Sequence, residues 1–346
     1  MLITGGAGFI GSNFVHWLLN RSTHNEQRHR LVVLDALTYA GNLANLQGLE
    51  RTESFRFVRG DIRDAELVRS VLLEEKIEFV VNFAAESHVD RSILGPLEFV
   101  RTNVEGTQIL LEESRRAGVE RFLQVSTDEV YGSLGPTGRF TEDSPLKPSS
   151  PYSASKAAGD LLALATYVTH GFHVCVSRCS NNYGPYQFPE KFIPLFVTNA
   201  LEDKPLPLYG DGKNIRSWLH VDDHSAALWC ILCDGKAGEV YNIGGAPESE
   251  KENIDTAHAI LEVLQKPKQL IRMVEDRKGH DRRYAVDYSK MHREFGWEPQ
   301  VKFPKGLAET VKWYCENRKW WMEVKSGEYQ SFYELYYGDR LAALTR

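Results

Sequence analysis

The sequence lacks the features that mark several other classes of protein. It contains no run of eighteen apolar residues, so we expect no membrane-spanning helix. The formal net charge is −6, and without a basic excess we expect no nucleic-acid partner, because phosphate backbones are bound by clustered cations. The chain also begins without the charged and apolar regions of a secretory signal peptide.

Cysteine is scarce, with five residues in a chain of 346. The odd number, without the spacing of a secreted disulfide framework, favours a reducing, cytoplasmic location. Cys230 and Cys233 have the spacing of half a metal site, but they lie in an apolar helical run without a second pair. We therefore expect two core residues there and no metal. The length indicates one large domain with a smaller one.

The N-terminal region predicts a dinucleotide-binding turn. Leu2–Thr4 is a short predicted strand, residues 5–11 are rich in glycine, and the apolar residues 14–19 predict a helix. Glycines let the backbone approach a pyrophosphate closely, and the helix N-terminus offers it free N–H groups. A second predicted strand, Leu31–Asp35, ends in a carboxylate that can accept hydrogen bonds from the adenosine ribose. No arginine directly follows Asp35 to bind a 2′-phosphate, so NAD is expected rather than NADP.

Strands and helices alternate through the first half of the chain. This alternation predicts a Rossmann-like, doubly wound parallel sheet that binds ligands at the carboxyl ends of its strands. The second half predicts a smaller, mixed α/β lobe, with irregular connections at residues 181–185 and 204–207. We therefore expect a cofactor domain with the catalytic residues at 1–180 and a mainly substrate-binding lobe at 181–346, with the chain crossing between them. The later predicted strands are 55–58, 79–85, 121–125 and 173–178, and the later predicted helices are 64–74, 97–117, 152–168, 191–201, 222–233 and 253–264.

A Tyr-x-x-x-Lys pair, Tyr152 and Lys156, begins the helix predicted at 152–168. Residues four apart lie on one face of a helix, so the ammonium is expected to lower the pKa of the tyrosine toward that of a usable base. Lys156 can also hold the nicotinamide ribose, and Thr127 can hydrogen-bond the hydroxyl that Tyr152 deprotonates. After a dinucleotide-binding turn this pair indicates hydride transfer, whereas alone it is typical of a surface helix.

Two acids, Asp128 and Glu129, follow Thr127 beyond the strand predicted for residues 121–125. Adjacent acids on an exposed turn are usually only solvated. If both face the cofactor instead, one can abstract the proton beside a newly formed ketone while the other, protonated, assists the departure of a β-hydroxyl. Such a pair would add the removal of water to simple oxidation.

Seven segments closely resemble the nucleotide-sugar 4,6-dehydratases of the extended short-chain dehydrogenase/reductase superfamily, and the similarity runs nearly from end to end. The Thr-Asp-Glu triplet at residues 127–129 is a specific mark, because GDP-mannose relatives generally carry Ser-Glu after the threonine. The chain departs from the family in a shorter N-terminus, where a few residues are expected to be missing, and in a longer, more charged segment at 246–252. The similar segments are 5–11, 84–92, 126–132, 152–156, 180–185, 189–194 and 279–284.

The resemblance implies a redox-neutral cycle on a nucleotide-diphosphate sugar. Tyr152 takes the proton of the C4 hydroxyl as hydride passes to NAD, Glu129 abstracts the C5 proton, and Asp128 protonates the departing C6 hydroxyl. Hydride then returns to C6 and C5 is reprotonated, which yields a 4-keto-6-deoxy sugar. The implied substrate is dTDP-glucose, with UDP-glucose as the rival substrate. Two rival functions also stay open, namely a 4-epimerase and a non-catalytic NAD-binding regulator. The family also implies a homodimer through the helices near 97–117 and 152–168.

The resemblance further implies, by family position, which residues form each part of the site. The catalytic residues are Thr127, Asp128, Glu129, Tyr152 and Lys156. The residues expected to bind NAD are Gly5, Gly8, Phe9, Ile10, Gly11, Asp35, Ala36, Leu37, Thr38, Asp61, Ile62, Ala84, Ala85, Ser87, Thr102, Tyr152, Lys156 and Asn182. Those expected to bind the nucleotide sugar are Ser87, Thr127, Asn181, Lys191, Pro207, Tyr209, Arg216, Asn253, Arg277 and His280. Arg216 is placed near the diphosphate, because a guanidinium matches phosphate oxygens.

Overall fold

The computed structural model describes residues 1–22, 29–49, 52, 54–326, 333 and 337 of the chain. Its centre is a parallel sheet of seven strands in the order β10-β6-β5-β4-β1-β2-β3. The order reverses between β1 and β4, which is where a doubly wound sheet binds its ligand. The predicted fold class is therefore confirmed. The strands are β1 Leu2–Thr4, β2 Leu31–Asp35, β3 Phe55–Arg59, β4 Phe79–Asn82, β5 Arg121–Thr127, β6 Val174–Cys179 and β10 Val240–Ile243.

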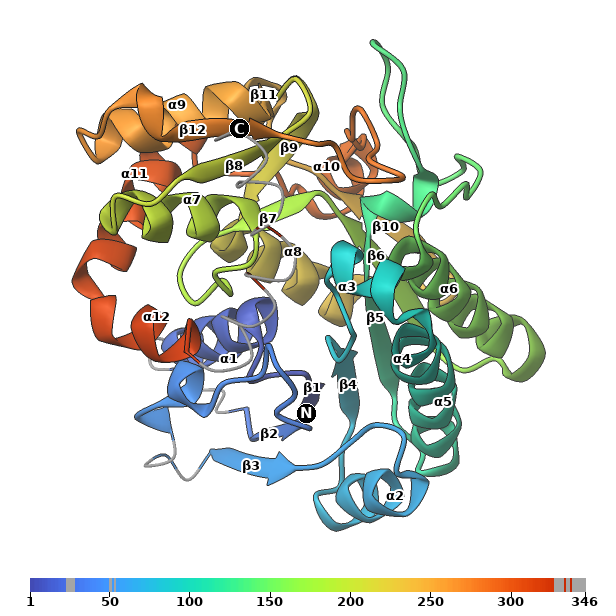
Figure 1. Cartoon of the computed structure of the whole chain (residues 1–346). Helices are drawn as coiled ribbons and strands as arrows, with labels where there is room; N and C mark the ends of the chain where they lie inside the picture. The colour runs from blue at the N-terminus through green and yellow to red at the C-terminus, as the bar shows by residue number, and fades with distance from the viewer. Residues whose placement is uncertain (23–28, 50–51, 53, 327–332, 334–336, 338–346) are drawn as a thin grey trace.

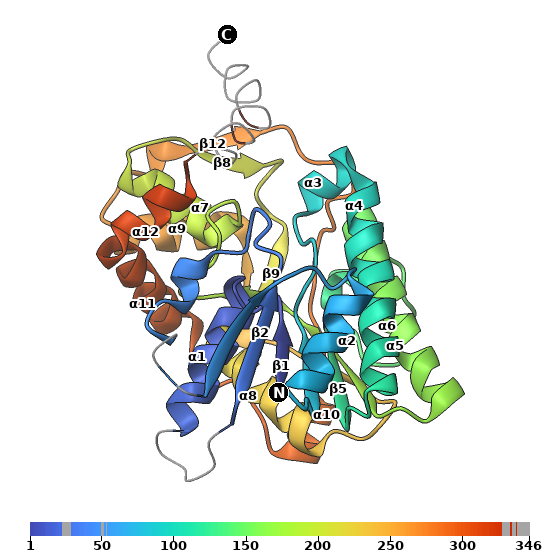
Figure 2. The same ribbon diagram turned by 90° about the horizontal axis from the view of Figure 1, so that it is seen from below.

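Helices cover both faces of this sheet (Figures 1 and 2). Helices α1 (Phe9–Ser22) and α8 (Val221–Asp234) pack together on one face, and α2 (Ala65–Glu74), α5 (Thr107–Arg116) and α6 (Pro151–His170) cover the other. Successive strand residues serve opposite faces. For example, Ile3 joins the core against α1, while its neighbour Leu2 joins the core against α5. Burial on both faces explains why these strands are almost continuously apolar.

The helix predicted at 97–117 is present, but a π-helical segment interrupts it. It consists of α4 (Pro96–Val100), the π-helical residues Arg101–Gly106 and then α5. Asn103 in the π-helical segment accepts a hydrogen bond from the Glu86 N–H and donates one to the Glu86 carbonyl oxygen, both of 2.9 Å. A π-helical turn of this kind often marks a functional site. Here it anchors the segment that follows β4, which lines the cofactor cavity described below.

The chain after residue 180 builds the smaller, mixed α/β lobe and also returns to the main sheet with α8 and β10 (Figure 1). Two of its strands, β7 (Asn181–Tyr183) and β8 (Leu206–Tyr209), occupy segments for which irregular connections were predicted, so those two predictions are wrong. Pro207 is compatible with β8 because that strand pairs on one side only, with β12 (Ile271–Val274). The division at residue 180 stays a prediction.

The remaining elements complete the lobe and the connections. The sheet β11-β9-β7 adds β9 Ile215–His220 and β11 Glu250–Glu252. No helix in the described part of the chain is long and apolar enough to cross a membrane. The other α-helices are α3 Val89–Leu94, α7 Phe192–Leu201, α9 Asn253–Val263, α10 Ser289–Phe295, α11 Phe303–Glu316 and α12 Arg318–Val324, and the 3₁₀ helices are Leu43–Leu46, Asp128–Tyr131, Pro247–Ser249 and Lys268–Leu270.

Candidate active site

A cavity of about 630 Å³ lies where several strands of the main sheet end. Of the residues expected to bind NAD, all but Leu37 line it. The side chain of Leu37 packs against the hydrophobic core instead, and its backbone adopts a left-handed conformation with φ of 54°. Its N–H donates to the Asp35 carboxylate at 2.8 Å. Leu37 therefore helps to shape the turn after β2 and does not face the cavity.

The glycine-rich turn between β1 and α1 has no room for side chains. Gly5 has φ of +65°, and a Cβ on it would lie 2.6 Å from the backbone nitrogen of Ala84. A Cβ on Gly11 would lie 2.4 Å from the carbonyl oxygen of Gly5. Because α1 begins at Phe9, its free N–H groups stand at the cavity wall. This bare turn at a helix N-terminus fits the pyrophosphate of a dinucleotide.

The carboxylate of Asp35 is held at the rim of the same cavity. Its two oxygens accept hydrogen bonds from the backbone of Ala7 at 2.9 Å and of Leu37 at 2.8 Å. Burial raises the pKa of Asp35, although these two backbone hydrogen bonds act in the opposite direction. Each carboxylate oxygen retains a second lone pair. The carboxylate is therefore suited to accept hydrogen bonds from ribose hydroxyls, as the sequence predicts for a cofactor of the NAD type.

The catalytic triplet lies where β5 ends. Thr127 closes the strand and caps the following 3₁₀ helix, because its hydroxyl accepts the N–H of Glu129 at 3.2 Å. Gly132 ends the turn with φ of +81°, and a Cβ there would lie 2.2 Å from the carbonyl oxygen of Lys147. Asp128 is only 1% exposed, and its Oδ2 makes no hydrogen bond in the described part of the chain. Thr127, Asp128 and Glu129 all line the large cavity, so the acids are not solvated surface residues.

Tyr152 and Lys156 enter the cavity from α6. The helix begins at Pro151 with a capping box in which the side chains of Ser150 and Ser153 bind each other's backbone N–H groups. This cap fixes the first turn, where Tyr152 lies, and Tyr152 lines the same cavity as Thr127. The Lys156 ammonium donates to the carbonyl oxygen of Val125 at 2.8 Å. The structure therefore brings the Tyr-Lys pair and the triplet to one wall.

The expected lowering of the Tyr152 pKa is wrong for the chain by itself. Burial, followed by the nearby Glu129 carboxylate, raises the pKa of Tyr152 well above its usual value. The polar side chain of Thr127 acts in the opposite direction but does not reverse the shift. Burial also lowers the pKa of Lys156, and its ammonium binds a backbone carbonyl rather than the phenol. Residue spacing alone did not reveal either effect.

The two acids lie in different electrostatic surroundings. Burial, followed by the charge of Glu129, raises the pKa of Asp128 well above its usual value. Burial also raises the pKa of Glu129, but the positive charges of Arg277, Lys191 and Arg216 act against this rise. Asp128 is therefore the acid that keeps its proton more readily, and Glu129 is the one that ionises more readily. Such a split separates a general acid from a general base.

A smaller cavity of about 160 Å³ adjoins the large one and shares Glu129, Asn181, Glu190 and Lys191 with it. Together the two cavities are lined by every residue expected to bind the nucleotide sugar. Arg216 is buried and held by the carbonyl oxygens of Ile215 at 2.8 Å and Asp281 at 3.0 Å. The smaller cavity is lined by Arg216, Arg277, His280, Asn253, Pro207 and Tyr209 among others.

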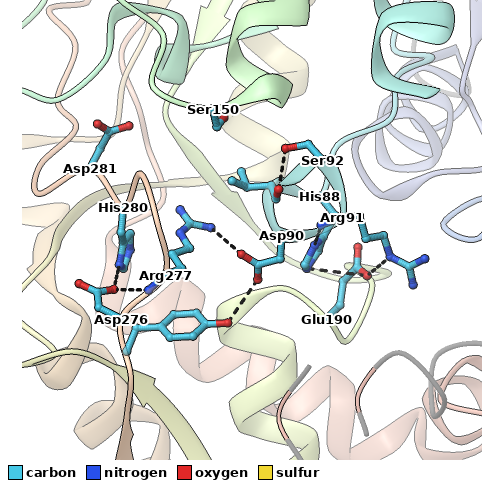
Figure 3. A network of polar contacts seen from close by, with 12 residues as sticks. His88, Asp90, Arg91, Ser92, Ser150, Glu190, Asp276, Arg277, His280 and Asp281 are labelled. Atoms are coloured by element: carbon cyan, nitrogen blue, oxygen red, sulfur yellow. Dashed lines mark hydrogen bonds and ion pairs between the residues drawn. The ribbon is translucent and has the colours of Figure 1, made fainter. Parts of the chain in front are cut away.

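Several residues of the site were not singled out from the sequence. His88 and Arg91, from the segment around α3, contact Glu190 at 3.8 Å and 3.3 Å (Figure 3). Burial raises the pKa of Glu190 to about 7, although the charges of Lys191 and Arg91 oppose the rise. Asp90, from the same segment, lies 3.6 Å from Arg277 (Figure 3). The segments 84–92 and 189–194 signalled the family, but nothing in their sequence assigned these contacts.

Comparisons with known proteins agree with this geometry. A family model described as GDP-mannose 4,6 dehydratase matches residues 2–310. The dTDP-glucose 4,6-dehydratase of Streptomyces niveus is 51% identical over 326 residues, which cover 94% of this chain and 96% of that protein. The dTDP-glucose 4,6-dehydratase of Escherichia coli is 47% identical, with 98% and 99% covered.

Solved structures give the same result. DesIV, the dTDP-glucose 4,6-dehydratase of Streptomyces venezuelae solved with NAD and TYD bound, is 53% identical with a TM-score of 0.90, covering 94% of this chain and 99% of that one. The UDP-glucose 4-epimerase of Thermus thermophilus, solved with NAD, is 30% identical with a TM-score of 0.83, covering 91% and 99%. The chain therefore belongs to the nucleotide-sugar 4,6-dehydratase family of the extended short-chain dehydrogenase/reductase superfamily.

Proposed function

We propose that this chain converts dTDP-glucose to dTDP-4-keto-6-deoxyglucose and water, with a tightly bound NAD. The observation that carries this proposal is the wall of the large cavity on which Thr127, Asp128, Glu129, Tyr152 and Lys156 meet. A simple dehydrogenase or epimerase needs the Tyr-Lys pair but not two acids, one buried and one half-buried, in the same cavity. The choice of dTDP-glucose is supported by the relatives, which are dTDP-glucose 4,6-dehydratases. Their similarity to this chain covers nearly their whole length.

The residues of the large cavity fit NAD. The bare glycine turn would hold the pyrophosphate, Asp35 the adenosine ribose, and Lys156 the nicotinamide ribose. When bound, oxidised NAD supplies the hydride acceptor for C4 and a positive charge that favours the Tyr152 phenolate, and its reduced form returns the hydride to C6. The small side chains of Ala84 and Ala85 leave the cofactor space against the backbone after β4.

Oxidation at C4 requires a base, and Tyr152 takes the proton of the C4 hydroxyl. Because burial and Glu129 raise the pKa of Tyr152, a positive charge that enters the cavity favours the phenolate. Thr127 lines the same cavity wall as Tyr152 and can hold the substrate hydroxyl beside it. Lys156 contributes an ammonium fixed on the carbonyl oxygen of Val125.

Removal of water follows once C4 is a ketone, because the ketone acidifies the proton on C5. Glu129, whose ionisation is favoured by the surrounding cations, abstracts this proton. Asp128, whose pKa is raised well above its usual value, donates a proton to the departing C6 hydroxyl. The two roles follow from the different surroundings of the acids rather than from their order in the sequence.

The diphosphate of the substrate carries negative charge and requires cations. Arg216 and Arg277 line the smaller cavity together with His280. A guanidinium presents several N–H donors in a plane that matches phosphate oxygens. With the sugar at Glu129, where the two cavities join, the nucleotide extends into the smaller cavity.

The experiment is product analysis after incubation with dTDP-glucose and, in parallel, with UDP-glucose. We expect a 4-keto-6-deoxy product from dTDP-glucose at a kcat/KM well above that for UDP-glucose. A 4-epimer as the main product, or equal turnover of the two nucleotides, would contradict the proposal. Tyr152→Phe, which keeps the ring, serves as the inactive control that still binds NAD.

A homodimer is a further part of the proposal. Leu94, Leu97, Leu161 and Val168 are each more than half exposed. They lie on α3, α4 and α6, which contact one another. Exposed apolar groups gathered on neighbouring helices suit an interface between copies of the chain. We also retain the cytoplasm as the compartment, in keeping with five free cysteines.

A further inference from the structure

Tyr337, which belongs to no recognised motif, lines the smaller cavity. Its side chain is 6% exposed and belongs to the hydrophobic cluster of the smaller lobe. Its ring stacks beside that of Tyr209, with centroids 6.1 Å apart and an angle of 27° between the planes. Residue 337 thus reaches a cavity whose other walls come from much earlier parts of the chain.

Hydrogen bonds join Tyr337 to residues already assigned to the site. The hydroxyls of Tyr209 and Tyr337 lie 3.0 Å apart, and the Tyr209 hydroxyl donates to Asp90 at 3.3 Å. The Tyr209 hydroxyl is thus within hydrogen-bond distance of both Asp90 and Tyr337, with one proton to donate. Asp90 in turn faces the guanidinium of Arg277 (Figure 3). Tyr337 is therefore connected to the substrate cavity through Tyr209.

A second contact holds Tyr337 from the side of α7. The ring of Tyr333, four residues earlier, lies 5.0 Å from that of Tyr337. The Tyr333 hydroxyl accepts a hydrogen bond of 3.1 Å from the side chain of Asn199. The ring of Tyr337 is therefore held between the rings of Tyr209 on β8 and Tyr333.

The lining of the smaller cavity combines two kinds of chemistry. Arg216 and Arg277 supply cations, and His280, whose pKa burial lowers to about 4, supplies an imidazole, whereas Tyr209, Trp218 and Tyr337 supply flat aromatic surface. The Nε of Arg277 is buried and makes no hydrogen bond within the described residues, so a donor is available for a bound anion. A nucleoside diphosphate has a matching division, because a flat base follows the charged phosphates. Aromatic rings pack well against such a base.

We propose that Tyr337 forms a wall of the nucleotide-sugar site and packs against the nucleoside portion of the substrate. This inference rests on the proposed function, because it places the sugar at Glu129 and the nucleotide in the smaller cavity. The contact is remote from C4, C5 and C6. It therefore contributes to binding equally in the ground state and the transition state, and its loss raises KM without lowering kcat.

The test compares Tyr337→Ala and Tyr337→Phe in the full chain, with Tyr333→Phe as the matched control. Steady-state kinetics with dTDP-glucose and calorimetric titration with dTDP are measured for each protein.

We expect Tyr337→Ala to raise both KM and the dTDP dissociation constant about tenfold, in keeping with one aromatic contact. The kcat should stay within about twofold. Tyr337→Phe keeps the ring and should change KM only about two- to threefold, the worth of one weak hydrogen bond. Tyr333→Phe should match the wild type.

Wild-type KM and dTDP affinity in Tyr337→Ala would overturn the inference, and so would a lower kcat at unchanged KM. Where Tyr337→Ala unfolds, Tyr337→Leu replaces it, because leucine fills the space without an aromatic ring. If the wild type binds dTDP but does not convert dTDP-glucose, the proposed function fails while the dTDP titration still decides the role of Tyr337. A wild type that does not bind dTDP would overturn both.

Discussion

Replacing Glu129 with glutamine should separate oxidation from elimination. The two side chains have almost the same shape, but the amide cannot abstract the C5 proton. A positioned general base contributes about 10²- to 10⁴-fold to a rate. We therefore expect kcat to fall by about that factor, which corresponds to roughly 2.7–5.5 kcal/mol in the activation barrier. The fall concerns only the steps after C4 is oxidised.

The structure predicts a second effect of Glu129→Gln on the oxidation step itself. The Glu129 charge is a cause, after burial, of the raised pKa values of Tyr152 and Asp128. Removing this negative charge lowers both pKa values. The Tyr152 phenolate then forms at lower pH, so the oxidation rate should reach its plateau at lower pH than in the wild type.

The assay follows reduced nicotinamide by its near-ultraviolet absorbance after rapid mixing with dTDP-glucose. Glu129→Gln should accumulate reduced cofactor, because C4 is oxidised and the cycle then stalls. Tyr152→Phe should accumulate none and serves as the control. The assigned role of Glu129 is refuted if the variant turns over within about threefold of the wild type, a change smaller than a lost general base produces, or if it stalls without reduced cofactor.

Three further variants test other parts of the structure. Gly11→Ala places a Cβ 2.4 Å from the Gly5 carbonyl oxygen, so the turn must shift. Because this shift costs about 1–3 kcal/mol, NAD affinity measured by titration should fall roughly 5- to 150-fold. Asp160→Asn breaks the buried 2.9 Å pair with Arg178 and should lower the free energy of unfolding in urea by about 3–5 kcal/mol. The double variant Asp160→Asn/Arg178→Met should recover most of that loss, whereas an equally unstable double variant would show that the unpaired charge is not the cause. Leu97→Asp should shift the particle mass in light scattering from dimer to monomer, and an unchanged mass would argue against the proposed interface.

Most strands of the main sheet could be predicted because each is a local apolar run bounded by turn or polar residues. Leu31–Asp35 is apolar up to its final acid, and the same residues form β2 in the structure. In contrast, β10 pairs with β6 through contacts far apart in sequence. Its position in the main sheet depends on the tertiary fold, so no local pattern predicted it.

The site shows the same difference between local and long-range information. The family resemblance implied that Thr127, Asp128, Glu129, Tyr152 and Lys156 form one catalytic set, and all five line the large cavity. Their spacing alone left open whether the two acids face the cofactor. The electrostatics depends on burial and on charges from other segments, which spacing does not contain. For this reason no sequence pattern indicated the raised pKa of Tyr152 or the position of Tyr337 in the substrate cavity.

The most direct test of the proposed reaction follows deuterium from C4 of the substrate. In dTDP-glucose labelled with deuterium at C4, a redox-neutral cycle with bound NAD transfers the label within the site. We predict that deuterium appears at C6 of dTDP-4-keto-6-deoxyglucose and is not lost to solvent. Loss of the label to water, or a product that is not a 4-ketone and still carries the label at C4, would contradict this mechanism.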